Sequence, residues 1–392
     1  MVQVKARIQR PTVVIGAGIV GISTAYALAA RGVPVVLLER FTIGHDRGSS
    51  HGESRIIRYS YSDFMYASLM RDAFQAWEGL ESAVGLPLYL RTGGLSFGPD
   101  HIPYVNSIAA NLQSLQVPCC YLTPARVSKL YPSLKMPEDY QCLFEPSAGV
   151  LMAEKVLHTL LDFTSERYAD LFTLRENTIV QGLDFDGANP MVLLADGERL
   201  EAERVVIAAG AWVRQLLPAE TRNMHVSRQC VFYLRPQTLD SFRPGRWPVL
   251  IFKGNDDQDL FYSLPALGAQ GVKVAQHSGA VCQPDSVSRD VGPADWQPVS
   301  DFLRKHLPSW AEAEQTQRTT CLYTMTPDED FRVGIIEQHE RVVMASPCSG
   351  HGFKFGPLVG RLVADICEKG RPHLDINRWQ PMGQPLARRV SL

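Results

Sequence analysis

Three glycines near the start of the chain have the spacing of a nucleotide-binding turn. Gly16, Gly18 and Gly21 form a G-x-G-x-x-G pattern, and Glu39 follows eighteen residues after the last of them. The first glycine permits a tight turn, the second lets the backbone approach a pyrophosphate, and the third lets a helix pack closely on a strand. An acidic residue at this distance can accept hydrogen bonds from a ribose diol. The four residues together predict a site for an adenine dinucleotide.

The elements expected around these glycines support that interpretation. Residues 13–15 form a short β-branched strand, an Ala- and Leu-rich helical stretch closed by Gly32 follows, and residues 33–38 form a second apolar strand that ends at Glu39. This is one βαβ unit, whose helix N-terminus faces the bound anion. The uncharged stretch 11–30 also resembles a signal peptide or a spanning helix, but its glycines and the strand that follows argue against both. The acidic residue disfavours NADP and leaves NAD and FAD open.

Other side chains that could do chemistry lie further along the chain. Lys273, Ala275 and His277 share one side of a β-like run, which taken alone is typical of a solvent-exposed face. Cys321, taken alone, is typical of an inert buried thiol. No His, Cys, Asp and Glu cluster has metal-ligand spacing, and no Ser-His-Asp arrangement stands out, so no metal is expected.

Composition limits the classes of protein that fit. The chain has 392 residues, with 39 Lys and Arg against 41 Asp and Glu, so its formal net charge is 39 − 41 = −2. This length predicts two or three compact units, and the charge argues against a nucleic-acid partner. Eight cysteines without a C-x-x-C motif argue against a disulfide scaffold and favour a reducing compartment.

The remaining expected elements are both helices and strands. Asp63 can cap a helix that runs to about Leu80, and Asp196-Gly197 predicts a hairpin. Residues 92–97 and 205–208 read as strands, 225–283 mostly as β structure, and 300–310 and 355–370 as helices.

Four segments downstream of the glycine pattern resemble the sarcosine oxidase family of FAD-dependent amine oxidases, in the D-amino-acid oxidase-like superfamily. They are residues 47–58 (RGSSHGESRIIR), 271–277 (GVKVAQH), 321–331 (CLYTMTPDEDF) and 349–355 (SGHGFKF). The chain looks most similar to the monomeric sarcosine oxidase and pipecolate oxidase branch, from Gly16 to about Gly370. A second strand–glycine element over residues 205–212 agrees with this arrangement, so the resemblance implies FAD rather than NAD.

The resemblance also implies roles for individual residues. It implies that Cys321 is bonded through sulfur to the 8α-methyl carbon of the flavin, and that Lys273 stands at the flavin ring and activates oxygen. It implies that Arg58 and Lys354 bind a substrate carboxylate and that Arg55 stabilises the reduced flavin. The active-site lining would be completed by His51, Tyr262, His277 and Tyr323. The cofactor contacts would come from Gly16, Gly18, Gly21, Glu39, Arg40, Ser50, Gly350, Gly352 and Lys354.

One short segment departs from the family. Relatives usually have Gly-Phe before the Ser-Gly-His-Gly-Phe-Lys segment, whereas this chain has Pro347-Cys348. Proline restricts the backbone and lacks an N–H donor, so the flavin contacts or the shape of the substrate pocket are expected to differ here.

The predicted fold is α/β, with a Rossmann-like FAD-binding domain interleaved with a mainly antiparallel β-sheet substrate domain. The FAD-binding domain is expected over residues 1–90, 152–224 and 324–392, and the substrate domain over 91–151 and 225–323.

The predicted enzyme oxidises a secondary amino acid, such as sarcosine, L-pipecolate or another N-methyl or cyclic amino acid, to an imine. Reoxidation by O2 would give H2O2. Three alternatives remain open: a biosynthetic oxidase that desaturates a ring, a dehydrogenase with another electron acceptor, and a non-catalytic FAD-binding protein. The last would not need Lys273, Arg58 and Lys354 together.

We expect a monomer with no membrane partner. The C-terminal sequence 388–392 (RRVSL) lacks a clear Ser-Lys-Leu signal, so a cytoplasmic location is expected, with the peroxisome as the alternative in a eukaryote.

Overall fold

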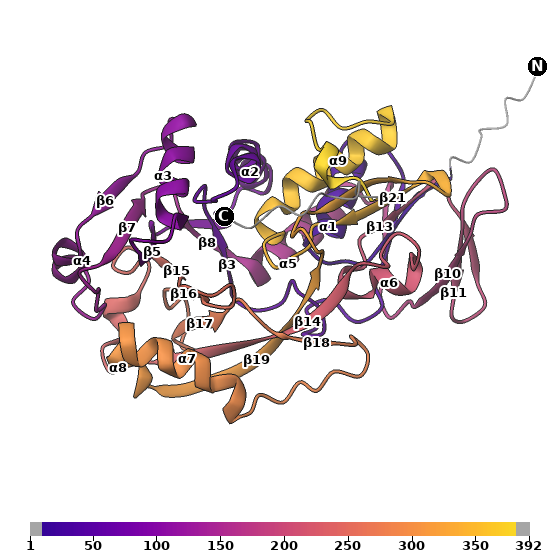
Figure 1. Cartoon of the computed structure of the whole chain (residues 1–392). Helices are drawn as coiled ribbons and strands as arrows, with labels where there is room; N and C mark the ends of the chain where they lie inside the picture. Colours follow the sequence, from indigo (N-terminus) through magenta and orange to yellow (C-terminus); the bar gives the residue numbers. More distant parts are fainter. Residues whose placement is uncertain (1–9, 382–392) are drawn as a thin grey trace, which may run out of the picture. The chain divides into compact units, whose positions relative to one another are not determined.

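The chain folds into two compact units, each assembled from separate stretches of sequence. The structure is a computed structural model that describes residues 10–381. The first unit comprises residues 10–50, 157–225 and 324–381, and the second comprises residues 51–156 and 226–323 (Figure 1). Residues 388–392, in which no clear targeting signal is expected, and the two ends of the predicted FAD-binding domain lie outside the described residues. The interleaving of two units along the chain agrees with the predicted architecture.

The first unit is built on a six-stranded sheet with the order β20-β21-β13-β1-β2-β9. Four neighbouring pairs from β21 to β9 are parallel, and β20 runs antiparallel to β21. Its strands are β1 (Thr12–Ile15), β2 (Val35–Leu38), β9 (Phe172–Arg175), β13 (Arg204–Ile207), β20 (Arg332–Ile336) and β21 (His339–Ser346). The predicted βαβ unit is confirmed, with β1 and β2 adjacent and α1 (Ile19–Ala29) between them in sequence.

Glycine lets two helices of this unit pack against each other closely. A Cβ on Gly360, in α9 (Gly356–Lys369), would lie 2.6 Å from the carbonyl of Ser23 in α1. Figure 1 shows the two helices side by side. The other elements of this part of the chain are α5 (Ala153–Arg167), β10 (Val180–Asp184), β11 (Met191–Leu194), β12 (Arg199–Glu201), η1 (Gly210–Trp212), α6 (Val213–Leu216), η3 (Phe353–Phe355) and η4 (Asn377–Trp379). The predicted Asp196-Gly197 hairpin is confirmed, because it joins the antiparallel strands β11 and β12.

The second unit contains a nine-stranded sheet with the order β18-β14-β17-β16-β15-β5-β7-β6, to which β19 adds by pairing with β14. Most of its ladders are antiparallel, whereas β15 runs parallel to β5. Its strands are β5 (Gly94–Pro99), β6 (Cys120–Leu122), β7 (Tyr140–Glu145), β14 (His225–Arg235), β15 (Val249–Lys253), β16 (Leu260–Leu264), β17 (Val272–Gln276), β18 (Ala280–Cys282) and β19 (Glu314–Met325). The predicted mainly antiparallel sheet and the predicted α/β class are both confirmed.

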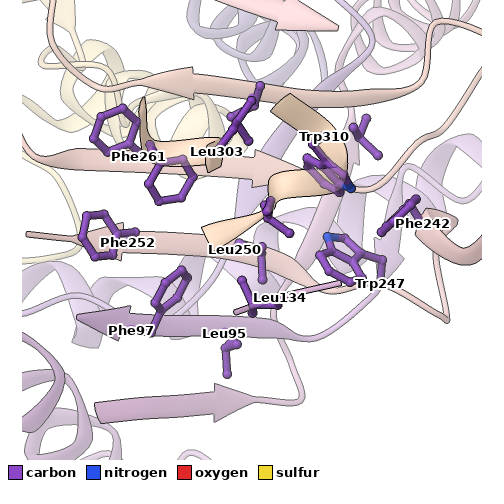
Figure 2. Close-up of a cluster of buried hydrophobic side chains, with 14 of the residues drawn as sticks. Leu95, Phe97, Leu134, Phe242, Trp247, Leu250, Phe252, Phe261, Leu303 and Trp310 are labelled. Carbon is purple, nitrogen blue, oxygen red and sulfur yellow. The ribbon is translucent and has the colours of Figure 1, made fainter. Parts of the chain in front are cut away.

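One face of this sheet carries a buried core rich in aromatic side chains. Alternate residues such as Leu250 and Phe252 of β15 and Val272 and Val274 of β17 point into it. Figure 2 shows how Trp247, Trp310 and their neighbours fill this cluster. The intervening side chains, among them Lys273, therefore point to the opposite face of the sheet, because successive residues of a strand alternate.

A small sheet and a long helix complete the second unit. The sheet has the order β3-β8-β4, formed by β3 (Ser54–Ile57), β4 (Tyr89–Arg91) and β8 (Gly149–Met152). The unit also contains α2 (Phe64–Val84), α3 (Tyr104–Ser114), α4 (Pro124–Leu130), η2 (Leu239–Phe242), α7 (Pro293–His306) and α8 (Pro308–Ala311). Asp63 caps α2 as predicted, and its carboxylate accepts from the amide of Met65 at 2.9 Å.

Two boundaries differ from the sequence-based expectation. The sequence predicts that residues 51–90 belong to the FAD-binding domain, whereas their contacts place them in the second unit, because β3 and β4 pair with β8. The helix expected over residues 300–310 begins at Pro293 and breaks at Leu307, because Pro308 starts a separate short helix.

His306 makes the stability of the second unit depend on pH. It is completely buried, its ring lies 5.0 to 5.7 Å from those of Phe97, Tyr140, Phe252 and Phe302, and burial lowers its pKa to about 4. The unfolded chain therefore binds a proton at a pH where the folded chain does not. The stability that depends on neutral His306 is present above pH 6.5 and is lost as the pH falls towards 4.

We expect His306 to cost about 2 kcal/mol of unfolding free energy between pH 7 and pH 5. In His306→Phe, which keeps an aromatic ring in this environment, that part of the acid destabilisation should disappear. Urea unfolding of both proteins at the two pH values measures the difference. An equal loss of stability in wild type and variant would contradict the assignment.

Candidate active site

The predicted nucleotide turn has the backbone that its glycines allow. Gly16 has φ +98°, and a Cβ there would lie 2.6 Å from the carbonyl oxygen of Ala208. A Cβ on Gly21 would lie 1.7 Å from the carbonyl oxygen of Gly16. Both positions therefore require glycine, and the turn brings the backbone of β1 and α1 close together. Gly18 is the N-cap of α1 and supplies no side chain there.

The N-terminus of α1 is prepared for an anion. The first amides of a helix have no partner within the helix and carry a partial positive charge. Ser50 accepts a hydrogen bond from the amide of Ile19 at 3.1 Å, so its hydroxyl lies beside that helix end. A narrow glycine turn at a helix N-terminus is the chemistry that binds a pyrophosphate. The residues present therefore fit the phosphate groups of a dinucleotide.

Glu39 is held at the end of β2 by three donors. Its buried carboxylate accepts from the amides of Ala17 at 2.8 Å and Phe41 at 2.9 Å, and His45 Nε2 lies 3.4 Å away. Burial alone raises the pKa of Glu39, but the hydrogen bonds from His45 and the two amides outweigh it and lower the pKa. The carboxylate is therefore ionised, and a carboxylate offers about four acceptor positions. One of them suits a ribose hydroxyl.

Aromatic side chains surround the next predicted cofactor residue. The guanidinium of Arg40 lies 5.5 Å from the ring centre of Phe41 and 5.6 Å from that of Trp212. The rings of Phe41 and Trp212 meet edge to face at 5.4 Å. Arg40 thus lies in an amphipathic setting near the end of β2.

The segment between β21 and α9 forms a tight turn. Ser349 and Gly350 have positive φ values of 61° and 77°, and a Cβ on Gly352 would lie 2.3 Å from the carbonyl oxygen of Pro347. Lys354 is buried, and its Nζ donates to the carbonyl of His351 at 3.0 Å. Pro347, where the chain departs from its family, therefore packs directly on the glycine of this turn.

Cys348, the second departing residue, is directed into the protein. Its Sγ donates to the carbonyl of Ser346 at 2.8 Å, and burial raises the pKa of its thiol to about 12. Such a thiol is inert as a nucleophile at neutral pH.

In the second unit, two cationic side chains converge on one carbonyl oxygen. Lys273 Nζ donates to the carbonyl of Ser54 at 2.9 Å, and Arg55 Nη1 donates to the same oxygen at 2.7 Å. Arg55 Nη2 also donates to the carbonyl of His51 at 2.6 Å. Lys273 is only 5% exposed, so burial first and the charge of Arg55 second lower its pKa well below the usual range.

Two tyrosines and a cysteine belong to the same cluster. Burial is the main cause that raises the pKa of Tyr262 and that of Tyr323. The neighbouring Cys321 raises both pKa values further. The charge of Arg55 lowers both pKa values in part. The ring of His277 lies 5.2 Å from that of Tyr323. Cys321 itself is buried, on the strand β19 that also carries Tyr323.

The sequence analysis missed one member of this cluster. Tyr233 of β14 lies directly opposite Lys273 in the ladder with β17, and it is buried with Val231 and Ala275. Burial raises the pKa of Tyr233, while the charge of Arg55 lowers it in part. The alternation of β14 places Tyr233 on one face, but only the register with β17 reveals that this face is the one with Lys273.

Arg58 follows β3 and presents a nitrogen that lacks a partner. Its guanidinium lies 4.7 Å from the ring centre of Tyr61, and its Nη1 is buried without a hydrogen-bond partner among the described residues. Burial raises the pKa of the neighbouring Tyr104, and the charge of Arg58 partly offsets this rise. A buried guanidinium nitrogen without an acceptor is costly, so this position favours an anionic ligand.

The predicted site residues divide between the two units. The first group contains Gly16, Gly18, Gly21, Glu39, Arg40 and Ser50, with Gly350, Gly352 and Lys354 on the turn before α9. The second contains His51, Arg55, Arg58, Tyr262, Lys273, His277, Cys321 and Tyr323.

Two features are absent from residues 10–381. No three His, Cys, Asp or Glu side chains in this range come together as metal ligands do. Within the same range, no helix combines the length and the apolar composition needed to cross a membrane.

Comparisons with known proteins show the family to which the chain belongs. A sequence-family model described as FAD dependent oxidoreductase (DAO) matches residues 12–366. Peroxisomal sarcosine oxidase of Homo sapiens is 32% identical over 399 residues, covering 95% of this chain and 97% of that protein. Monomeric sarcosine oxidase of Bacillus sp. (strain B-0618) is 30% identical over 374 residues, covering 93% of this chain and 94% of that protein.

Solved structures show the same fold. NikD, described as an unusual amino acid oxidase essential for nikkomycin biosynthesis, superposes with a TM-score of 0.83 at 25% identity, covering 97% of this chain and 99% of that one. L-proline dehydrogenase from P. horikoshii has a TM-score of 0.82 at 23% identity, covering 95% and 97% respectively. The chain therefore belongs to the FAD-dependent oxidoreductase family, alongside the sarcosine oxidases, and is an FAD-dependent amine oxidoreductase.

Proposed function

We propose that this enzyme oxidises the C–N bond of a secondary amine that carries a carboxylate, such as sarcosine, L-pipecolate or another N-methyl or cyclic amino acid. The amine loses two electrons and two protons to become an imine, and O2 gains them to become H2O2. FAD, when bound, supplies the two-electron carrier between these half-reactions. The observation that carries the substrate class is Arg58 Nη1, which is buried and has no hydrogen-bond partner within residues 10–381.

Arg58 would hold the substrate by its acid group. A guanidinium offers a planar pair of donors that matches a carboxylate, and it stays charged at any working pH. The Tyr61 ring beneath the guanidinium fixes its plane. Lys354 is proposed as a second cation for this carboxylate. Tyr262, Tyr323, His277 and His51 would line the substrate site, and their aromatic surfaces suit the apolar part of a small amine.

Lys273 would serve the oxygen half-reaction, and Arg55 would stabilise negative charge on the reduced cofactor. Both side chains are fixed by hydrogen bonds to the Ser54 carbonyl, so little reorganisation is needed when negative charge develops near them.

The cofactor would be held by the glycine turn and Glu39 at one end. The turn formed by Gly16, Gly18 and Gly21 would make room for the pyrophosphate. Further contacts would come from Arg40, Ser50, Gly350, Gly352 and Lys354. We propose that Cys321 carries the flavin through a bond from its sulfur to the 8α carbon. The two sarcosine oxidase relatives and the position of Cys321 among Lys273, Tyr262 and Tyr323 support this assignment.

Anaerobic mixing with sarcosine, L-pipecolate, L-proline and larger N-methyl amino acids tests the proposal. We expect the yellow colour to bleach with at least one of them, and admission of air should restore it with one H2O2 per imine. Acid precipitation of the purified protein should leave the colour in the pellet, because the flavin is bound covalently.

Each rival function predicts a different outcome. A dehydrogenase would bleach with substrate but react slowly with air. A ring-desaturating oxidase would form H2O2 and a product that carries a ring double bond beyond the C=N bond of the first imine. A non-catalytic protein would not bleach with any amine. Colour that washes out of the acid pellet would contradict the bond to Cys321 alone. We also propose a monomer, which size-exclusion chromatography tests, while the cytoplasmic location stays a prediction.

A further inference from the structure

A fully buried carboxylate lies behind Arg58. Glu145 is the last residue of β7 and has no exposed surface. Its Oε1 accepts from the amide of Tyr59 at 2.9 Å and from the hydroxyl of Ser147 at 2.8 Å. Its Oε2 accepts from the amide of Ser60 at 2.9 Å and from the Ser60 hydroxyl. No ion pair joins Glu145 to a cation in the described part of the chain.

These donors include the two amides directly after Arg58. The strand β3 ends at Ile57, which pairs with Gly149 of β8, so the following amides have no strand partner. The Glu145 carboxylate supplies acceptors in place of a strand. The amide of Tyr61 then donates to the carbonyl of Tyr59 at 2.7 Å, which closes a tight turn.

The turn fixes both members of a stacked pair. Arg58 lies at its start and Tyr61 at its end, and the Arg58 guanidinium covers the Tyr61 ring at 4.7 Å. If the amides that Glu145 binds were to shift, the backbone of Arg58 and the Tyr61 ring under its guanidinium would therefore move as well.

The Glu145 carboxylate fixes the 58–61 turn without forming an ion pair with Arg58. A carboxylate has about four acceptor positions, and four donors already fill those of Glu145. Glu145 therefore anchors the backbone beside Arg58, while Arg58 Nη1 stays without a partner among the described residues.

We infer that Glu145 is a positioning residue that sets the affinity of this enzyme for the carboxylate of its substrate, acting through the 58–61 turn. This inference rests on the proposed function, since it takes Arg58 as the residue that grips that carboxylate. No catalytic contact of Glu145 itself is implied, because its side chain is buried behind the turn.

Glu145→Gln is the decisive variant, with the flavin-loaded enzyme used throughout. Glutamine has the same shape as glutamate, but its NH2 group is a donor and replaces one of the two acceptor oxygens. The two donors that bonded to that oxygen therefore lose their acceptor. We expect amide hydrogen exchange at Tyr59 and Ser60 to accelerate by about tenfold or more. We expect the KM for the best substrate in the amine panel and the inhibition constant of sodium acetate to rise about tenfold, with kcat changed less than about threefold.

Ser60→Ala is the milder companion, because it removes one donor and keeps the carboxylate. Ser60→Ala should raise the KM and the acetate inhibition constant by a smaller factor than Glu145→Gln. If Glu145→Gln does not fold, the result with Ser60→Ala tests the inference. Thr164→Val is the matched stability control, since it removes a buried hydroxyl that donates to the Leu160 carbonyl at 2.6 Å in α5. Its KM should equal that of the wild type.

The outcomes separate this inference from the proposed function. Unchanged exchange at Tyr59 and Ser60 in Glu145→Gln overturns the inference whatever the enzyme does. Faster exchange with unchanged KM and acetate inhibition overturns it as well, and so does a fall in kcat without a change in KM. A wild-type enzyme that oxidises no carboxylated amine overturns the proposed function instead, and with it the role of Arg58 on which the inference depends.

Discussion

Lys273→Met is expected to slow the reaction of the reduced enzyme with oxygen by about 10²–10³-fold, while reduction by the amine changes less than about tenfold. Lys273 is nearly buried and fixed to the Ser54 carbonyl at 2.9 Å, so its amine is already oriented before charge appears. As oxygen is reduced, negative charge develops, and a fixed cation lowers the energy of that charge most where water is excluded. Methionine fills a similar volume without the charge.

Stopped-flow absorbance measures the two half-reactions separately, first with the amine under anaerobic conditions and then by mixing the reduced enzyme with oxygenated buffer. Lys253→Met is the matched control, because Lys253 ends β15, which lies two strands away from β17 in the same sheet, and its Nζ donates to the Asp256 carbonyl at 2.6 Å. It should leave both rates within about twofold. An equal loss in both half-reactions of Lys273→Met would assign Lys273 to the amine or to the fold rather than to oxygen.

Local patterns in the sequence were enough to predict the nucleotide turn. The G-x-G-x-x-G spacing, the β-branched run before it and the acid after the second strand lie within thirty residues, so no long-range information was needed. The structure has the strand–turn–helix geometry that this pattern predicts: Gly16 has φ +98° and a Cβ on Gly21 would overlap the Gly16 carbonyl. The Asp63 cap was equally local, since its partners Met65 and Tyr66 follow within three residues.

The second group of site residues depended on information that a single sequence does not display. The cluster brings Ser54 and Lys273, which are 219 positions apart, into hydrogen-bond contact. Tyr233 joins it only through the register between β14 and β17, and a shift of one residue would have placed it on the other face. The family resemblance supplied roles for Lys273 and Arg58, but it named neither Tyr233 nor Glu145.

The predictions of one helix boundary and one domain boundary were wrong for a related reason. The sequence signals for the start of α7 are Gly292 and Pro293, which are compatible with both a loop and a helix N-terminus. The structure decides between them, because Asp295 accepts from the Gly292 amide at 2.8 Å and also pairs with Arg228 of β14. The assignment of residues 51–90 likewise depended on strand pairing with β8, which no local pattern encodes.

Arg58→Ala is expected to lower kcat/KM for a carboxylated amine by about 10²–10³-fold, almost entirely through KM. The guanidinium grips a part of the substrate that does not change during oxidation, so it binds the ground state and the transition state alike. Loss of such uniform binding raises KM and leaves kcat nearly constant. Arg58→Lys keeps the charge but loses the planar fork, and its KM should lie between those of the wild type and Arg58→Ala.

Two further measurements make the Arg58 prediction specific. Added guanidinium ion should restore part of the activity of Arg58→Ala, because the cavity left above Tyr61 can hold the free cation. Arg71→Ala is the control, since Arg71 lies on α2 and donates to the exposed Leu115 carbonyl at 2.8 Å. It should keep the wild-type KM. If Arg58→Ala instead lowers kcat and leaves both KM and acetate inhibition unchanged, then Arg58 does not bind the acid group. The substrate class would then have to be sought without a carboxylate, because the buried Nη1 of Arg58, which favours an anionic ligand, would have another use.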